Sequence, residues 1–426
     1  MLMKTSTLLL CAAMLALGVV QTKAQMSEYD YNQPVGWATV EYNSTGNYAE
    51  HNSFTVTGSN DANPVRVTTL SELRNAINTA KRTPTTIYID GEINVSEQIP
   101  INNTSDLTIY GLPGSALIND EYSDNKEVTG ILKLSGCNNV IIRNVTFIGS
   151  GAHDIDGRDN FWINSSSHNI WIDHCDFQDG VDSNFDCSNG SDNIAVTWCR
   201  FRYLKEPISG GSGGSDDHRF SNTWGGGDDN GEEDEGHLNT TFYACWWDEG
   251  CRNRMPRVRF GKVHLLNCLY TSSVTDNCVG VGYMSNVNID RCTFIDIKEP
   301  WANYATEGNY RTYNVTVTGC LGANEEQSQA GSEEYFTPST YYTLEGMPVD
   351  LVETEVSTYA GATLNVEYGE GVTTGISNIG VSDADVVSTE YFSPSGTRLN
   401  APQRGLNIVR QKMSDGTVRT RKTIVK

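Results

Sequence analysis

"IWIDHCDF", residues 170–177, belongs to a pattern that recurs along the chain. Its first and third residues are apolar, its sixth is cysteine and its eighth is aromatic. The other copies are IAVTWCRF (194–201), TTFYACWW (240–247), VHLLNCLY (263–270), VNIDRCTF (287–294) and VTVTGCLG (315–322), the last of which ends in glycine. An earlier copy, VIIRNVTF (140–147), has Val145 in the cysteine place. Alternating apolar residues before a turn predict a short strand with one buried face.

The spacing of the copies predicts how these strands are arranged. Successive cysteines of the pattern are 24, 46, 23, 24 and 28 residues apart, and glycine, asparagine and aspartate are common between them. A strand repeat of this period, without helices, favours a parallel β-helix in which each repeat forms one coil. Equivalent positions then stack about 4.8 Å apart. The sequence therefore predicts an all-β protein, with sustained helical periodicity only at residues 71–81.

The 46-residue gap is interpreted as one coil with an excursion rather than as two coils. Residues 209–236 lie within it, are rich in glycine and acidic residues, and show no strand pattern. Such a composition predicts a loop.

The repeated cysteines are expected to form a ladder inside the coils. Small apolar thiols suit a buried row, and the backbone direction of stacked coils is poor for disulfide geometry. We therefore expect mostly free thiols in the ladder. The cysteines outside it are the better disulfide candidates, and their pairing cannot be deduced from the sequence: Cys137, Cys187, Cys251 and Cys278.

The first 24 residues have the features of a secretory signal peptide. A lysine near the start is followed by an apolar run and by a small residue, Ala24, at the expected cleavage site. The run is shorter than the roughly 20 residues that span a bilayer, and no later stretch is long and apolar enough to do so. The formal net charge of −23 argues against nucleic acid and anionic membranes as partners. We expect an exported protein without a membrane span.

Charged residues recur at similar distances after the aromatic of the repeat. Asp182 and Asp186 come five and nine residues after Phe177, and Arg254 comes seven after Trp247. Similar positions on successive coils place these side chains on one face. Lys205, four residues after Phe201, and Asp159, twelve after Phe147, are expected to join them. Aspartates gathered in this way suit a hard cation with oxygen ligands, such as Ca²⁺.

Three stretches resemble the pectate lyases of polysaccharide lyase family 1: NIWIDHCDF (169–177), DSNFDCSNGSDNIAVTW (182–198) and RMPRVRFGKVHLLNCLY (254–270). The resemblance extends from residue 36 to about residue 362. It implies a right-handed parallel β-helix and a secreted enzyme that cleaves polygalacturonate, the acidic polymer of pectin. The reaction would be a Ca²⁺-dependent β-elimination that leaves unsaturated oligogalacturonates. Where the family commonly has an internal asparagine ladder, this chain has its cysteines.

The resemblance also implies roles for single residues. Asp159, Asp182 and Asp186 match calcium ligands, and Arg254 matches the arginine that abstracts the proton. Lys205 and Arg259 match substrate-binding residues, although YLKEP (203–207) is one residue shorter than the commonest spacing. Arg257 has a weaker claim. Asp173 and His174 lie within the strand, away from the other charged residues, and we interpret them as a structural hydrogen-bonded pair.

Three other functions are compatible with a β-helix of this kind. A pectin lyase would run the same chemistry on methyl-esterified pectin without calcium, and the three aspartates speak against it. A non-catalytic, sugar-binding β-helix would have little need for RMPRVR (254–259) beside an acidic cluster. A polygalacturonate hydrolase would need paired carboxylates for acid–base work, and its glycine–histidine–glycine signature does not occur here.

The chain is expected to contain a catalytic β-helix at residues 25–372 and a small β-rich tail at residues 373–426. The tail carries eight basic and four acidic residues, unlike the acidic remainder. It resembles the sorting tails of exported Bacteroidetes proteins. We expect a monomer that is periplasmic, surface-bound or extracellular.

Overall fold

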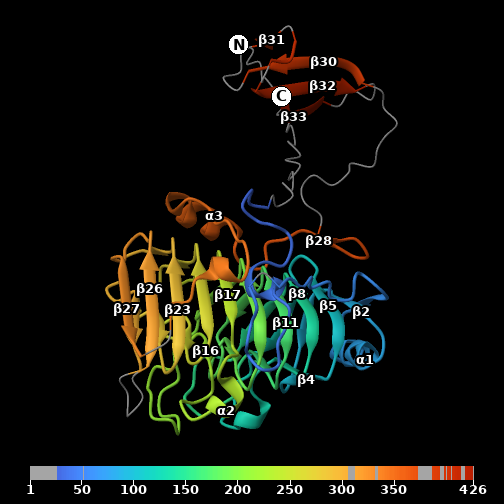
Figure 1. Cartoon of the computed structure of the whole chain (residues 1–426). Helices are drawn as coiled ribbons and strands as arrows, with labels where there is room; N and C mark the ends of the chain where they lie inside the picture. The colour runs from blue at the N-terminus through green and yellow to red at the C-terminus, as the bar shows by residue number, and fades with distance from the viewer. Residues whose placement is uncertain are drawn as a thin grey trace, which may run out of the picture. The chain divides into compact units, whose positions relative to one another are not determined.

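The computed structural model describes residues 26–50, 52–305, 312–331, 334–372, 386–393, 398–399, 401–403, 405–413 and 418–425. The predicted signal peptide, residues 1–24, lies outside the described residues. The chain separates into two compact units between Thr373 and Thr374. The larger unit is a right-handed parallel β-helix, so the predicted fold class is confirmed (Figure 1).

Three sheets run along the β-helix, because nearly every coil contributes one strand to each. The first sheet contains β1 (Pro64–Val67), β2 (Thr85–Ile89), β5 (Ser105–Gly111), β8 (Asn138–Arg143), β11 (His168–Asp173), β14 (Asp192–Thr197), β17 (Thr240–Tyr243), β20 (Lys262–Leu266), β23 (Ser285–Asp290), β26 (Tyr313–Thr318) and β27 (Glu326–Ala330). Its strands are parallel except for β27, which pairs antiparallel with β26.

The other two sheets have eight strands each. The second contains β4 (Ile99–Asn102), β7 (Leu132–Ser135), β10 (Phe161–Asn164), β13 (Phe185–Cys187), β16 (Thr223–Trp224), β19 (Arg257–Val258), β22 (Val279–Val281) and β25 (Trp301–Asn303). The third contains β3 (Glu92–Asn94), β6 (Ala116–Asn119), β9 (Thr146–Gly149), β12 (Asp176–Gln178), β15 (Arg200–Arg202), β18 (Trp246–Trp247), β21 (Leu269–Tyr270) and β24 (Thr293–Phe294).

The repeated pattern forms the corner between the first and third sheets. In the copy at 170–177, β11 ends at Asp173, His174 makes the turn, and Phe177 lies in β12. The residue before the ladder position has a left-handed φ, between +46° and +63°, in seven successive coils: Asn144, His174, Trp198, Ala244, Asn267, Arg291 and Gly319. This one residue turns the chain and directs the next side chain, usually cysteine, into the interior.

The cysteine ladder and an aromatic stack confirm the predicted register. The cysteines of neighbouring coils lie beside one another. For example, the backbone N–H of Cys175 donates to Sγ of Cys199 in the next coil at 3.4 Å. The aromatic rings beside them stack with centroids 4.5–5.3 Å apart, in the order Phe147, Phe177, Phe201, Trp247, Tyr270 and Phe294. Because offset-stacked rings attract beyond their burial, the stack helps to hold each coil on its neighbour.

Among the described residues every cysteine is a free thiol, which confirms this expectation for the ladder. The suggestion that the other cysteines form disulfides was wrong. Cys137, Cys187, Cys251 and Cys278 are all buried within the same apolar core as the ladder. They pack as small hydrophobic residues and need no cross-link.

The excursion was predicted correctly as an insertion within one coil, because β14 pairs directly with β17 and β15 with β18. It is not all loop, however. β16 lies within residues 209–236 and joins the second sheet between β13 and β19, and the short α2 (Gly231–Asp234) follows it. The strand is two residues long, Thr223 outward and Trp224 inward, which is too short for a recognisable alternating pattern.

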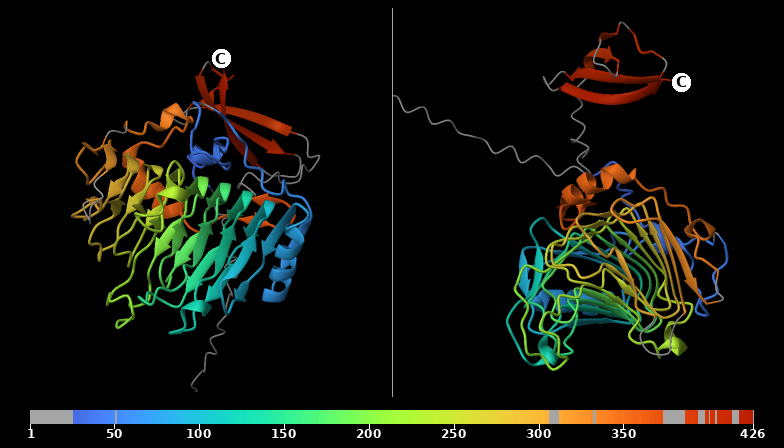
Figure 2. Two further views of the ribbon diagram at one scale, coloured as in Figure 1. Left: turned by 60° about the horizontal axis from the view of Figure 1, so that its bottom comes forward. Right: turned by 90° about the vertical axis from the view of Figure 1, so that its left-hand side faces the viewer.

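Most of the remaining helical segments lie at the first end of the coil stack or over the outer face of the first sheet (Figure 2). The helix predicted at 71–81 is present as α1 (Leu70–Ala80), which begins with a Thr69–Glu72 capping box. Short helical segments occur at η1 (Gly36–Thr39), η2 (Lys126–Val128), η3 (Pro338–Thr340), η4 (Val349–Leu351) and α3 (Val352–Tyr359). η1 contacts β11, β14 and β17, and α3 packs its buried valines on Leu266 and Leu269. No helix in the described ranges is long and apolar enough to cross a membrane.

The smaller unit contains a four-stranded antiparallel sheet in the order β31-β30-β32-β33. Its strands are β30 (Val386–Phe392), β31 (Arg398–Leu399), β32 (Gly405–Met413) and β33 (Val418–Val425). The larger unit ends with the hairpin of β28 (Val366–Glu367) and β29 (Gly371–Val372).

Candidate active site

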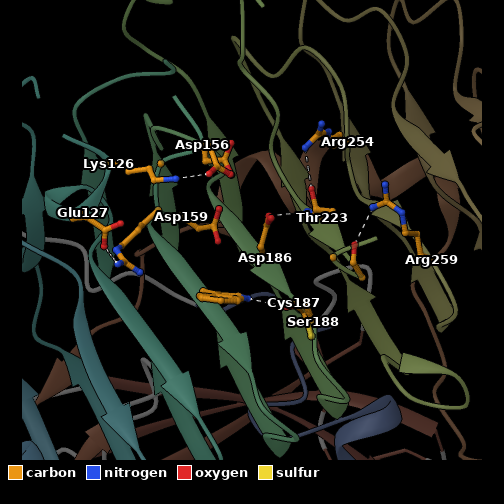
Figure 3. A pocket seen from close by; sticks show the side chains of 16 residues that line it. Lys126, Glu127, Asp156, Asp159, Asp186, Cys187, Ser188, Thr223, Arg254 and Arg259 are labelled. Atoms are coloured by element: carbon orange, nitrogen blue, oxygen red, sulfur yellow. Dashed lines mark hydrogen bonds and ion pairs between the residues drawn. The ribbon is translucent and has the colours of Figure 1, made fainter. Parts of the chain in front are cut away.

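The outer face of the second sheet carries a row of polar side chains. Parallel pairing places Lys133, Trp162, Asp186, Thr223 and Arg257 beside one another on successive strands, while their neighbours point into the core. Figure 3 shows the pocket that opens over the middle of this row. It has a volume of about 500 Å³, and its walls include Asp159, Asp182, Asp186, Arg254 and Arg259. Five of the six predicted site residues thus line one pocket.

The three aspartates reach the pocket from adjacent coils. Asp159 precedes β10, Asp182 precedes β13, and Asp186 projects outward from β13 between inward Phe185 and Cys187. Burial raises the pKa of Asp186 to about 7, with a further contribution from the charge of Asp182. Burial also raises the pKa of Asp159 well above its usual range, and the charges of Asp186 and Asp182 add to it. Each of these two carboxylates therefore experiences the negative charge of a neighbouring aspartate in addition to the effect of burial.

The carboxylates fit an oxygen-ligated cation. Oδ1 of Asp159 is buried without a hydrogen-bond partner, which is a costly arrangement for an anionic oxygen. A hard divalent cation would satisfy it and would relieve the repulsion among the three aspartates. In the described part of the chain, no three His, Cys, Asp or Glu side chains form a metal site by themselves. As they lie in this structure, the three aspartates therefore do not make up a metal site on their own, and a cation among them would need further ligands from water or substrate.

Arg254 lies on the opposite side of the pocket from Asp159 (Figure 3). Its backbone has a left-handed φ of +56°, a conformation that few non-glycine residues adopt. Its guanidinium donates to Thr223 Oγ1 at 3.3 Å and lies 4.5 Å from the centre of the Phe220 ring. The side chain thus points across β16 towards Asp186.

Arg259 directly follows β19 and lines the pocket together with Arg254. It forms an ion pair with Asp228 at 2.7 Å, and its Nη1 donates to the carbonyl of Gly225 at 2.9 Å. Gly225 has a left-handed φ of +92°, and a Cβ there would lie 2.8 Å from the Cβ of Arg259. The acidic excursion therefore supplies a counter-ion to one of the cations of the site.

Two of the other predicted basic residues lie outside the pocket wall. The Arg257 guanidinium lies 4.6 Å from the centre of the Tyr304 ring, further along the second sheet. Nζ of Lys205 donates to the carbonyl of Gly149 at 2.8 Å, and its backbone N–H donates to Asp179. The structure therefore does not bring Lys205 together with the aspartates and Arg254.

Asp173 and His174 form the expected structural pair. Nδ1 of His174 lies 2.9 Å from the Asp173 carboxylate, and Nε of Arg143 donates to it at 2.8 Å. All three side chains are buried where β8 and β11 end and the chain turns towards the third sheet. Burial alone would raise the pKa of Asp173, but His174 and Arg143 hold it down at about 2. This network is separate from the pocket.

The sequence did not indicate several residues that shape the pocket. Lys126 pairs with Asp156 at 2.6 Å, and Arg158 pairs with Glu127, so two inter-coil ion pairs form the wall near Asp159 (Figure 3). Trp162 forms part of the floor, with Nζ of Lys133 lying 4.2 Å from its ring centre. These residues lie on the outer face of the second sheet or in loops between the copies of the repeat. The repeated sequence pattern does not extend to these positions, so it could not predict them.

Comparisons with known proteins point to one family. The family model described as pectate lyase matches residues 9–365. Pectate lyase plyB of Emericella nidulans is 29% identical over 327 residues, which cover 75% of this chain and 84% of the relative. Pectate trisaccharide-lyase of Thermotoga maritima is 33% identical over 199 residues, which cover 46% of this chain and 47% of the relative.

Solved structures share the fold. A pectate lyase from Bacillus sp. N165, determined in complex with trigalacturonate, superposes with a TM-score of 0.57 at 17% identity. The match covers 78% of this chain and 99% of that one. Together with the family model, which spans most of the sequence, these similarities establish that the chain belongs to the pectate lyase family and is a polysaccharide lyase.

Proposed function

We propose that this protein is a secreted pectate lyase that cleaves polygalacturonate by Ca²⁺-dependent β-elimination, with Arg254 as the base. The observation that carries the proposal is the convergence of three mutually repelling aspartates and Arg254 in one pocket. A polymer with a carboxylate on every sugar suits a cleft that holds a cation and arginines, even on an acidic protein.

Asp159, Asp182 and Asp186 would hold the calcium ion. When bound, the ion neutralises the substrate carboxylate and so makes the proton on the adjacent carbon more acidic. Without a cation, the ionised forms of Asp159 and Asp186 are unfavourable, because burial and neighbouring negative charges raise the pKa of both carboxyls. These two residues should therefore contribute most to the dependence on metal.

The chain's own residues would act as follows. Arg254, in its neutral form, removes the proton from C5 of the galacturonate, the electron pair left on C5 forms the new double bond to C4, and the 4-linked oxygen leaves as a hydroxyl with a proton taken from solvent. Arg259 binds a substrate carboxylate after exchanging its ion pair with Asp228. Lys205 would bind substrate only after releasing the carbonyl of Gly149. No water is consumed, so the products are unsaturated oligogalacturonates.

The test is to incubate the protein with polygalacturonate and to follow the ultraviolet absorbance of unsaturated ends. A lyase generates this absorbance, whereas a hydrolase or a sugar-binding protein does not. Activity on methyl-esterified pectin without Ca²⁺, and none on polygalacturonate, would identify a pectin lyase instead. The three aspartates favour the pectate lyase, because a neutral substrate gives them no role.

Asp186→Asn should separate metal binding from folding. Since the carboxyl has a folded-state pKa of about 7 against an ordinary value of 3.8, the folded state binds this proton more tightly than the unfolded state does. The metal-free wild type should therefore lose stability as pH rises from about 4 to about 7. Asp186→Asn should weaken that dependence and melt higher than the wild type in EDTA at about pH 8, yet gain little from Ca²⁺.

Thermal melting in EDTA and in Ca²⁺, at about pH 5 and about pH 8, measures both effects. Asp176→Asn is the matched control, because its carboxylate pairs with Arg202 on the third sheet, away from the pocket. A variant that melts far below the wild type under all conditions would show that Asp186 is a structural residue.

We further propose that the protein is exported and that residues 373–426 serve sorting or surface attachment. The basic composition of the tail and its own antiparallel sheet support this proposal. Truncation after Thr373 keeps the β28–β29 hairpin, including Val372, which packs against Tyr88 and Tyr110. The truncated protein should retain its melting temperature and activity but change its location in the producing cell. Failure to fold would mean that the tail stabilises the β-helix instead.

A further inference from the structure

The excursion between β15 and β17 reaches the pocket and pairs with the segment that carries Arg254. Phe220 forms a parallel bridge with Asn253, and the N–H of Ser221 donates to the carbonyl of Asn253 at 3.1 Å. The N–H of Asn222 donates to the carbonyl of Arg254 at 2.7 Å. These bonds hold the peptide groups on either side of Arg254, whose left-handed backbone would otherwise be unfavourable.

His218, in the same excursion, contacts one of the three aspartates. Its imidazole is buried, and its Nε2 lies 2.9 Å from Oδ1 of Asp182. On the other side of the ring, Nδ1 lies 3.4 Å from Oδ1 of Asp154. Asp154 is itself fixed, since its other carboxylate oxygen accepts the N–H of Ser215 at 2.7 Å. The imidazole thus lies between two carboxylates, but only its contact with Asp182, which lines the pocket, is a hydrogen bond, and Nδ1 is buried without one.

Phe220 lies between His218 and Arg254. The centre of its ring lies 4.3 Å from the centre of the His218 ring. The Arg254 guanidinium lies 4.5 Å from the centre of the same Phe220 ring. The Phe220 backbone is tied down by Tyr203, whose hydroxyl donates to its carbonyl at 2.8 Å. An arginine side chain has many rotamers, and an aromatic face within this distance favours those that lie against it.

We propose that His218 and Phe220 are positioning residues, His218 for the carboxylate of Asp182 and Phe220 for the guanidinium of Arg254. The inference rests on the proposed function of these two site residues. Outer partners of metal ligands commonly set the ligand's orientation, and a base must be held close to the reacting proton. The two roles are separable, because one ring acts on the metal side of the pocket and the other on the base.

The experiment compares Phe220→Leu and His218→Leu in the full-length protein. Calorimetry on the free enzyme gives the Ca²⁺ dissociation constant, and initial rates on polygalacturonate at saturating Ca²⁺ give kcat and KM. Phe220→Leu should lower kcat by about 10- to 100-fold with the Ca²⁺ Kd unchanged. His218→Leu should raise the Ca²⁺ Kd by about 10- to 100-fold, with most of kcat recovered at saturating Ca²⁺.

Conservative variants and a control complete the design. Phe220→Tyr keeps the aromatic face and should restore kcat, and His218→Gln keeps a donor near the Nε2 position and should restore most of the Ca²⁺ affinity. Arg219→Gln is the matched control, because Arg219 lies between the two residues but pairs with Asp217. It should leave both measurements unchanged. If the leucine variants do not fold, His218→Asn, which is too short to reach Asp182, and Phe220→Met make the same comparison.

The inference is overturned if folded Phe220 and His218 variants match the wild type, or if each shifts kcat and Ca²⁺ affinity alike, as a general loosening of the loop would. These outcomes differ from failure of the proposed function itself. In that case the wild type would produce no unsaturated ends from polygalacturonate, and the positioning roles would fall with it.

Discussion

Arg254→Lys should lower the turnover of polygalacturonate by a factor of about a thousand or more, comparable to the loss of a positioned acid–base group. Lysine keeps the charge, but it lacks the planar fork and presents its single nitrogen at a different position. It would also lose the face-to-ring contact with Phe220 and the bond to Thr223 that direct the arginine across the pocket. Affinity for substrate should change little, because Arg259 and the cation proposed to bind at the aspartates provide it.

The neighbouring arginines serve as controls for this prediction. Arg259→Lys should raise KM while retaining part of the turnover, since Arg259 binds through a fork now engaged by Asp228 and Gly225. Arg257→Lys should have the mildest effect, because that side chain lies against Tyr304 outside the pocket wall. Initial-rate kinetics on purified variants give both parameters. Equal, modest losses at all three positions would indicate a diffuse basic patch and would contradict a catalytic role for Arg254.

The β-helix could be predicted from the sequence because nearly every coil needs the same buried side chains at the same positions. From the copy at 140–147 to the copy at 287–294, the cysteine and aromatic positions are buried, so a change of register would place them in solvent, and their spacing therefore reports the coil length directly. The same argument located the excursion, since β14 and β17 must stack whatever lies between them. Asp186 could be placed on the outer face for a related reason, because its neighbours in β13 are core residues.

The contacts of the excursion could not be predicted, because they depend on how an aperiodic loop folds back. Nothing in the spacing of residues 209–236 indicates that His218 contacts Asp182 or that Asp228 pairs with Arg259. Lys205 illustrates the same limit. Its position after Phe201 predicted a place beside the aspartates, but the conformation of the loop after β15 directs its amine to the carbonyl of Gly149 instead. The cysteines outside the repeat show a related limit. Because Cys251 has no place in the period, the sequence could not show whether it is a buried free thiol or a disulfide partner.

Chelation should abolish the lyase activity, and added Ca²⁺ should restore it. Without a cation, the pocket contains a buried carboxylate oxygen of Asp159 with no partner, and two aspartates whose raised pKa values reflect burial and mutual repulsion. The substrate would add further carboxylates to this cluster, so polygalacturonate should bind poorly to the metal-free protein.

The measurement is the rate of unsaturated-end formation after dialysis against EDTA, followed by titration with Ca²⁺ and, separately, with Mg²⁺. Ca²⁺ should restore activity better than Mg²⁺, because an open site completed by substrate and water suits a cation with flexible coordination. Since protons compete with the cation at Asp159 and Asp186, the Ca²⁺ concentration for half-maximal rate should rise as pH falls below about 7. Full activity in excess EDTA would contradict the calcium proposal. The aspartates would then need another role, and the preference for polygalacturonate over methyl-esterified pectin would lose its main structural support.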